Sequence, residues 1–330
     1  MDIKNILLAM LNGAYDSIRG IGTLIYMDKE LDNRTRQRLS PSRQSSTIRR
    51  RESDLTKEAT PVRTLKAHEE SKVLKRTIQC SVLNGGIFLA SIMLFDYGIL
   101  PFLNFVLQMI FGENTSTSGT IWSWTRPFLV CIFQAIWVMP LFLLSKCVNC
   151  LWFQDIADNA YRYSRGRPQI AEGLSKRIAD SIFSIVVQTL FLVQAMLIDY
   201  IPIFLIGRIF SCIHLCMLYS LYTFEYKWYN MRWELHRRLT FIETNWPYFI
   251  GFGLPMTILT QVSDSWIING CIFSILFPLF IVSGNEASPV THTVNFPLSL
   301  FSPVIAITNT ILNRSIDAAN AHMQANAKRR

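Results

Sequence analysis

The chain has 330 residues, of which 50% are hydrophobic and only 17% are charged, whereas about 25% of the residues in a soluble protein are charged. Together with a mean hydropathy of +0.26, this composition excludes an ordinary soluble domain and predicts a multispanning membrane protein. The formal net charge is +9, and residues 1–77, ahead of the first apolar run, hold 16 Lys and Arg against 10 Asp and Glu. The positive-inside rule accounts for this bias, so we expect no nucleic-acid partner.

Residues 1–77 predict a cytosolic N-terminal region in two parts. Over residues 3–26, apolar side chains recur at steps of three and four opposite a polar face, which indicates an amphipathic helix. The apolar face consists of Ile3, Leu7, Met10, Leu11, Ala14, Ile18, Ile21 and Ile25. Such a helix either lies in the membrane interface or packs on the cytosolic side of the protein itself, and the pattern leaves both open. Residues 28–61 are rich in Arg, Ser and Thr, so we expect a disordered basic linker.

Residues 78–144 predict the first two spans. The first span ends near Asp96, and we expect Gly98 and Pro101 to break the helix before a second apolar piece, which is re-entrant or interfacial. The polar loop that follows places Asn114 in a glycosylation sequon, which is usable if this loop is lumenal. Two tryptophans then mark an aromatic belt, and the second span follows over residues 128–144.

Residues 178–224 form the longest apolar stretch. Only Asp180, Asp199, Arg208 and His214 can carry charge within these 47 residues. Because one span needs about 20 apolar residues, we expect a helical hairpin that crosses the membrane twice and turns just after Asp199.

A second hairpin is expected from residues 247–262 and 267–282. Its first arm has only 16 residues and contains Gly251, Gly253 and Pro255. It therefore either crosses fully, which gives six crossings and two cytosolic termini, or penetrates halfway. The predicted fold is an all-α integral membrane protein with about six membrane-embedded helices, the alternative being two long spans plus half-penetrating hairpins. The membrane domain covers residues 78–283 and a cytosolic tail covers residues 284–330.

Ionisable groups inside a membrane are costly, so they are the first candidates for function. Arg208, His214 and Asp96 are the intramembrane polar candidates. An arginine in the bilayer either binds an anion or extends its charge to the interface. Cys147 and Cys150 have the spacing of a zinc or redox pair, but no second pair lies nearby. With no catalytic motif in the chain, we expect neither an enzyme nor a cofactor or metal.

Two segments with polar and aromatic residues at predicted membrane boundaries are the candidate contact surface. Their residues are Phe153, Gln154, Asp155, Asp158, Glu225, Tyr226 and Trp228. The alternative is that these residues serve folding and anchoring alone.

Four long segments carry a resemblance to a known family. They read WVMPLFLLSKCVNCLWFQDIA (residues 137–157), SLYTFEYKWYN (220–230), NWPYFIGFGLP (245–255) and GCIFSILFPLFIVSGNEA (270–287). In this order they resemble the etoposide-induced protein family of multispanning endoplasmic-reticulum proteins. The family is also similar to bacterial sulfate permeases of the CysZ type, whose fold combines long spanning helices with half-penetrating hairpins.

The resemblance implies a role in autophagosome formation and maturation, with links to growth suppression and apoptosis. We therefore expect a non-enzymatic protein of the endoplasmic-reticulum membrane that acts through protein or lipid contacts, with membrane lipids and other autophagy proteins as its partners. The kinship with permeases gives the alternative, an anion transporter or channel for sulfate-like ions, with Arg208 as its candidate site.

Overall fold

The structure, a computed structural model, describes residues 3–39, 73–112, 116–166, 174–199 and 204–311. Among these residues there are helices and no strands, which confirms the predicted all-α class. Five helices are long and apolar enough to cross a membrane. This count rests on the length and composition of each helix, at about 20 residues per crossing. The chain is therefore an all-α membrane protein.

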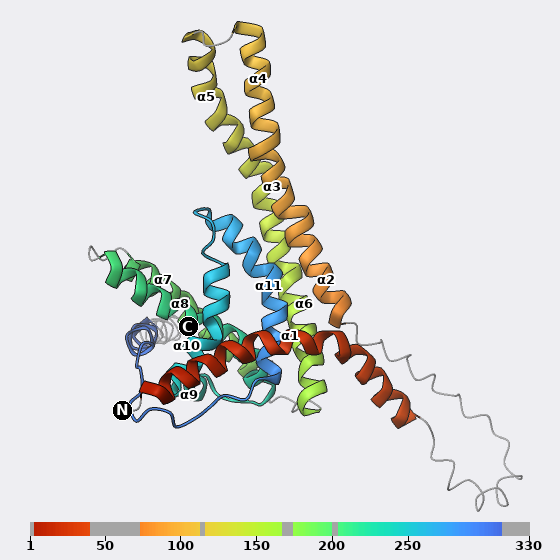
Figure 1. The fold of residues 1–330 in the computed structure, drawn as a ribbon, viewed down its shortest axis with the longest axis vertical. Coiled ribbons are helices and arrows are strands. Elements are labelled where there is room, and N and C mark those ends of the chain that lie inside the picture. The colour runs from red at the N-terminus through yellow and green to blue at the C-terminus, as the bar shows by residue number, and fades with distance from the viewer. Residues whose placement is uncertain (1–2, 40–72, 113–115, 167–173, 200–203, 312–330) are drawn as a thin grey trace, which may run out of the picture.

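A long helical hairpin rises out of the rest of the molecule (Figure 1). Its first arm is one continuous 39-residue helix, Val73–Phe111, about 58 Å long at 1.5 Å per residue. The arm consists of α2 (Val73–Ser81), η1 (Val82–Leu89), α3 (Ala90–Leu94), η2 (Phe95–Ile99) and α4 (Leu100–Phe111). The second arm consists of α5 (Ser116–Phe133), η3 (Gln134–Val138) and α6 (Met139–Arg165). Stacked rings of Phe95 and Phe133, with centroids 3.8 Å apart, join the two arms.

The predicted break at Pro101 is wrong, because the helix continues through it to Phe111. A proline lacks an N–H and its ring crowds the preceding turn. Here a wider π turn, η2, lies directly before Pro101, and another, η3, directly before Pro140. Each π turn makes room for the ring without ending the helix.

The other helices form a lower body around the base of this hairpin (Figure 1). They are α7 (Leu174–Asp199), α8 (Phe204–Asn230), α9 (Leu235–Thr244), α10 (Trp246–Leu259), α11 (Trp266–Glu286) and a short helix, Ser302–Ile311. As predicted, α7 and α8 form one hairpin, and α10 and α11 form the other, with Asp264 in its turn. A Cβ at Gly253 of α10 would lie 2.0 Å from the Cys216 carbonyl oxygen of α8. Only glycine permits this close crossing of α8 and α10.

The α10–α11 hairpin is too short to cross a bilayer at its first arm. The 14 residues of α10 span about 21 Å, against about 30 Å for the hydrocarbon core. Its turn ends well below the α4–α5 turn (Figure 1). For this hairpin the length of α10 matches the expected half-penetrating alternative rather than a full crossing.

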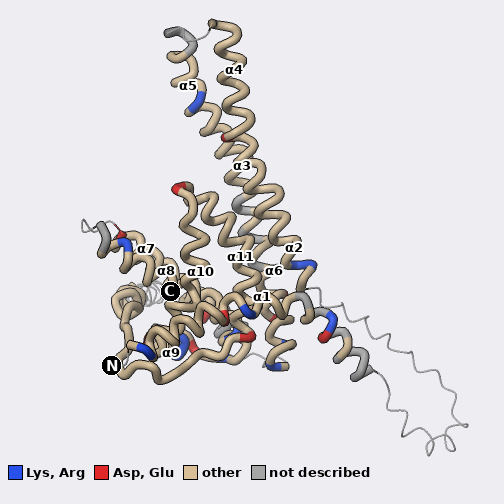
Figure 2. Tube along the Cα trace, in the orientation of Figure 1, with Lys and Arg blue, Asp and Glu red and all other residues tan. Residues whose placement is uncertain are grey.

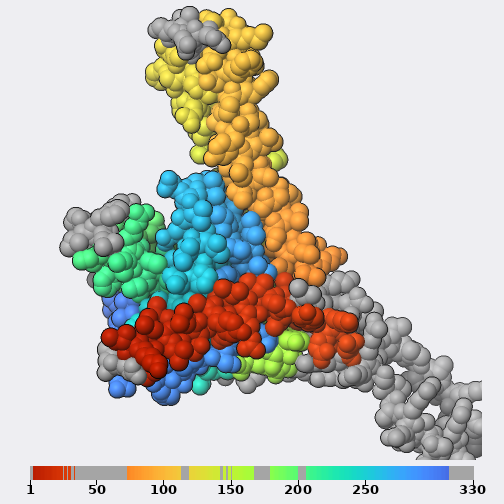
Figure 3. All heavy atoms as spheres, in the orientation of Figure 1, coloured from red at the N-terminus to blue at the C-terminus, as the bar shows by residue number. Residues whose placement is uncertain are grey.

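Helix α1 (Ile3–Leu39) lies across the lower body and packs on α10 and α11 (Figure 3). A Cβ at Gly13 would lie 2.1 Å from the Tyr248 carbonyl oxygen, and a Cβ at Gly251 would lie 2.0 Å from the Met10 carbonyl oxygen. The backbones of the two helices therefore touch. A Cβ at Gly20 would likewise lie 2.2 Å from the Ser283 Cα of α11.

Helix α1 is longer than the sequence pattern suggested. It extends to Leu39, so residues 28–39 are helical rather than part of a disordered linker, and residues 40–61 lie outside the described part of the chain. Between residues 28 and 39 there is no glycine or proline, and Leu, Lys, Arg, Gln and Glu favour helices. Glu30 and Arg34 have the i, i+4 spacing that supports a helix. Low hydrophobicity was a poor guide to disorder here.

The chain after α11 folds back over α7 and α9. The Phe301 N–H donates to Glu243 Oε1 over 2.8 Å, and the Leu298 N–H donates to the Glu243 carbonyl oxygen over 2.9 Å. The Phe301 ring is fully buried and stacks on Phe191 of α7 with centroids 4.0 Å apart. These contacts fix residues 298–301 to the body.

Candidate functional site

A buried polar network joins α7, α8 and α9. The Arg238 side chain of α9 is 2% exposed; its Nη2 lies 2.8 Å from Asp180 Oδ2 and its Nη1 lies 3.3 Å from Glu225 Oε1. Glu225 also accepts hydrogen bonds from Ser184 and Gln188 of α7. Because a buried arginine is stable only with compensating acceptors, the two carboxylates hold the three helices in one arrangement.

A second polar contact fixes the end of α11. Lys227 of α8 is 3% exposed, and its Nζ donates to the Gly284 carbonyl oxygen over 3.0 Å and to the Ala287 carbonyl oxygen over 2.7 Å. A cation at the C-terminus of a helix satisfies its last carbonyls. Nearby, the Tyr248 hydroxyl of α10 donates to Asp16 Oδ2 of α1 over 2.7 Å. These bonds tie α1, α8, α10 and α11 together.

The residues of the predicted contact surface are mostly used inside the fold. Phe153 is 8% exposed and Trp228 is 2% exposed, so neither presents its side chain to a partner. Glu225 belongs to the network around Arg238, and the Tyr226 ring packs near Phe277 with centroids 6.1 Å apart. For these residues the alternative of folding and anchoring accounts for the pattern.

The remaining three predicted contact residues lie on one stretch of α6. Gln154 Nε2 donates to Asp158 Oδ1 over 2.8 Å, and Asn230 of α8 donates to the same oxygen over 3.1 Å. Asp155 is exposed and lies 3.6 Å from Arg76. Of the predicted surface, Asp155 is thus the residue best placed to meet another molecule.

The three intramembrane candidates do not form one site. Asp96 lies on η2 of the long hairpin, whereas Arg208 and His214 lie on α8. His214 is buried; its Nδ1 lies 2.7 Å from the Phe210 carbonyl oxygen and its Nε2 lies 3.0 Å from Gln194 Nε2. Both ring nitrogens are therefore engaged: the Nδ1 contact stays within α8, and the Nε2 contact joins α8 to α7. Arg208 and Asp96 are exposed.

Two sequence candidates cannot be placed. Asn114 lies outside the described residues, and so do the side chains of Cys147 and Cys150. The glycosylation site and the cysteine spacing thus stay predictions.

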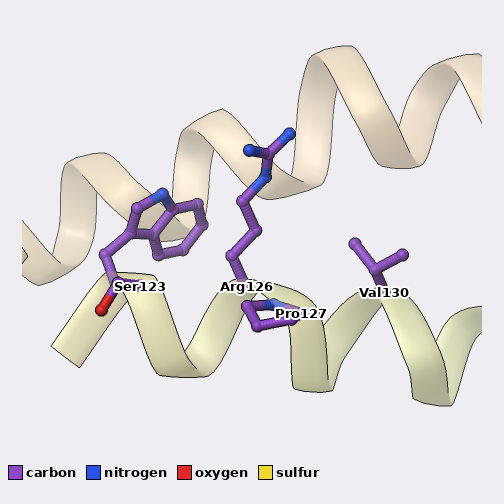
Figure 4. A pocket seen from close by; sticks show the side chains of 5 residues that line it. Ser123, Arg126, Pro127 and Val130 are labelled. Carbon is purple, nitrogen blue, oxygen red and sulfur yellow. The ribbon is translucent and has the colours of Figure 1, made fainter. Parts of the chain in front are cut away.

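Sequence reasoning missed a groove on the part of the long hairpin that rises above the lower body, residues 93–111 and 116–137, which we call the outer hairpin. It has a volume of about 410 Å³ and is lined by Trp122, Ser123, Arg126, Pro127 and Val130 of α5. Figure 4 shows the Arg126 side chain extending from α5 toward the neighbouring helix. The signal in the sequence was a single Arg next to the two tryptophans of the aromatic belt.

The arrangement of helices and the four sequence segments point to one family, and the comparison decides it. Residues 61–263 match the family described as "Sulfate transporter CysZ/Etoposide-induced protein 2.4", EI24. This chain belongs to the EI24 family. The resemblance stated from the sequence is confirmed.

Curated relatives agree with the EI24 assignment. The chain is 29% identical to "Protein EI24 homolog" of Arabidopsis thaliana over 66% of this chain and 76% of the relative. It is 32% identical to "Protein EI24 homolog" of Dictyostelium discoideum over 71% of each chain. It is 34% identical to "Ectopic P granules protein 4" of Caenorhabditis elegans over 46% of this chain and 49% of the relative. No solved structure matches the chain significantly.

The EI24 membrane domain also contains a polar clamp that sequence reasoning missed. Asn84 of η1 and Asn149 of α6 exchange hydrogen bonds of 3.1 Å, and Ser145 donates to Asn84 Oδ1 over 2.5 Å. All three side chains are buried between the arms of the long hairpin. The available signal was an i, i+4 pair, Ser145 and Asn149, in an otherwise apolar segment.

Proposed function

We propose that this EI24-family chain is a non-enzymatic protein of the endoplasmic-reticulum membrane that supports autophagosome formation and maturation through lipid or protein contacts. The links to growth suppression and apoptosis belong to the same proposal. The family membership and the relatives named EI24 homolog support it.

One structural observation carries the contact mechanism. Helix α1 is packed on α10 and α11 through its small residues, yet Leu7, Leu11 and Ile18 on another face are 55%, 67% and 60% exposed. An apolar stripe on a docked helix is suited to the interface of a membrane. The lower body carries most of the charged residues, whereas the outer hairpin carries few (Figure 2). By the positive-inside rule this supports a cytosolic lower body and cytosolic termini.

The test is autophagic flux in cells that lack the protein, with rescue by variants of α1. Leu11→Glu places a charge on the exposed apolar stripe, and Asn12→Glu places the same charge one residue away on the polar face. We expect wild type and Asn12→Glu to restore flux and Leu11→Glu to fail at equal expression. Normal flux in the knockout, without accumulation of early autophagic structures, would refute the proposal.

A second candidate function is anion transport. The family description names a sulfate transporter, and Arg208 is exposed on a candidate membrane-spanning helix. Purified protein in liposomes is then expected to pass sulfate, and Arg208→Ala is expected to lower the flux. Absence of sulfate flux in a preparation of defined orientation would exclude this candidate.

A further inference from the structure

The molecule has two levels of very different width. At the lower level the long hairpin contacts α8 and α11, α8 in turn contacts α7 and α10, and α1 packs across α10 and α11. The upper limit of this level is marked by Ile267 and Cys271 of α11, which pack against Phe88, Ile92 and Val138 of the long hairpin. Above it the two arms stand alone (Figure 3). From Ile92 to Phe111 the first arm rises by about 28 Å more.

Both shorter hairpins end within an apolar environment. The α10–α11 turn exposes Ile258, Leu259, Val262 and Trp266, by 43% to 72% of their surface. The far ends of α7 and α8 expose Met196, Leu197, Ile206 and Ile209, by 50% to 65%. Clusters of exposed large apolar side chains in a membrane protein indicate contact with lipid chains. Asp199, Arg208 and Asp264 are also exposed at these ends and are costly in lipid, but the apolar side chains around them are more numerous. We therefore place the two turns within the hydrocarbon core, so that the leaflet beyond them meets only the two arms of the long hairpin.

Helix α1 adds to the width of the lower leaflet. Its small residues, Ala9, Gly13, Ser17 and Gly20, are buried against the body, whereas Leu7, Leu11 and Ile18 point away from it. The polar residues Asn5 and Asn12 lie on a third side, because successive residues turn about 100° around a helix. A helix with a protein face, a lipid face and a water face lies along the membrane boundary. It is 37 residues long and covers about 55 Å.

We propose that the membrane domain is a wedge whose broad end lies in the leaflet that holds α1, and that it binds preferentially to bilayers that are convex on that side. With a helix about 10 Å across, six helices occupy roughly 480 Å² in the α1 leaflet, whereas two occupy roughly 160 Å² in the other. The excess is roughly 300 Å² before α1 is counted. A convex leaflet has its headgroups spread apart, so it accepts this excess area, and amphipathic helices are sensitive to such curvature.

In the opposite placement, the bilayer surrounds the outer hairpin alone. This placement agrees less well with the distribution of exposed apolar side chains. The outer hairpin is long enough for one crossing, but the apolar side chains at the turns of α7–α8 and α10–α11 would then face water. The wedge places both sets of apolar residues in lipid. It is independent of any role in autophagy, and its test uses lipid and the full chain alone.

The test is the distribution of the purified, fluorescently labelled protein between a giant vesicle and a thin tube pulled outward from it. The label is placed at the C-terminus. A quencher added outside the vesicle then reports the orientation of each population, because it reaches only labels on the outer side. We expect protein with α1 on the outer leaflet to be several-fold enriched on the tube relative to a lipid dye, and protein with α1 on the inner leaflet to be depleted. Equal density on tube and vesicle in both orientations, or the same sign in both, would overturn the wedge.

A variant pair isolates the part played by α1. Leu7→Gln, Leu11→Gln and Ile18→Gln together remove the lipid face and leave the buried residues of α1 intact. The control, Asn5→Gln and Asn12→Gln, places the same side chain on the polar side. We expect the triple variant to lose a large share of the enrichment and the control to keep it. Unchanged enrichment in the triple variant would refute the contribution of α1.

Discussion

Replacing Gly13 by alanine should detach α1 from the membrane domain. The added Cβ would lie 2.1 Å from the Tyr248 carbonyl oxygen and 2.7 Å from the Phe252 backbone nitrogen. Both are backbone atoms of α10, so no side-chain rotation relieves the contact. Non-bonded heavy atoms pack best at about 3.5 Å, so α1 must move by about 1 Å or more. That shift also stretches the 2.7 Å bond between Tyr248 and Asp16.

The magnitude follows from three contributions. Overpacking costs about 1–3 kcal/mol, and a rigid backbone contact belongs at the upper end of that range. Loss of the Tyr248 hydrogen bond adds about 1 kcal/mol. Alanine in place of glycine recovers about 0.5–1 kcal/mol of helix stability. The net expected loss is about 2–3 kcal/mol.

Gly22 provides a matched control on the same helix. A Cβ at Gly22 meets nothing within 4 Å, so Gly22→Ala should gain about 0.5–1 kcal/mol from helix propensity alone. The assay is thermal unfolding of the purified protein in mild detergent, together with hydrogen exchange of the α1 amides. Gly13→Ala should exchange faster along α1 and unfold at lower temperature than Gly22→Ala. If the two variants are equally stable, the close contact between α1 and α10 does not fix α1.

Three further changes test the polar contacts. Arg238→Ala leaves two partly exposed carboxylates, Asp180 and Glu225, without their cation, and should destabilise the protein by somewhat less than the roughly 3–5 kcal/mol of a fully buried pair. The control, Arg237→Ala, loses an exposed contact with a tryptophan ring and should cost about 0.5–1 kcal/mol. Equal losses of thermal stability in the two variants would contradict the network. Burial raises the pKa of the Glu243 carboxyl above its ordinary value of 4.5. The protonated carboxyl therefore stabilises the fold fully below pH 4.5, and this stability is lost as the pH rises through the raised pKa. Glu243→Gln should therefore unfold at higher temperature than wild type near neutral pH, with the difference vanishing toward pH 4.5, and a difference independent of pH would refute this. A double-mutant cycle by thermal unfolding tests the clamp. The double variant, Asn84→Leu with Asn149→Leu, should lose less stability than the sum of the two single variants, because each single change leaves a buried amide without its partner. Additive losses of stability would exclude the clamp.

The sequence predicted the all-α membrane class because long apolar runs leave few alternatives. The hairpin turns after Asp199 and around Asp264 were also placed correctly, since charged residues avoid the interior of an apolar span. The break at Pro101 was wrong because a single proline reads the same whether a helix ends or widens by one π turn. The pattern alone does not separate these outcomes.

The candidate site was harder to predict for a different reason. Glu225 and Trp228 look like surface residues at a membrane boundary, but Glu225 pairs with Arg238 of a separate helix and Trp228 is buried. Only the tertiary arrangement shows that such polar residues are satisfied internally. For α1, the apolar face was read correctly, whereas the face that docks it consists of small residues such as Gly13, which have no hydrophobic signal.

Two of the π segments of the long hairpin, η2 and η3, lie at nearly the same height, joined by the stacked rings of Phe95 and Phe133. A π turn interrupts the regular i to i−4 bonding of a helix and is a common place for a bend. Here both arms have such a place just above the point where α11 ceases to support them. The outer hairpin can thus change its tilt as a unit while the lower body keeps its position. Since tilt sets how much thickness a helix covers, such a change lets one chain match membranes of different thickness without repacking its core.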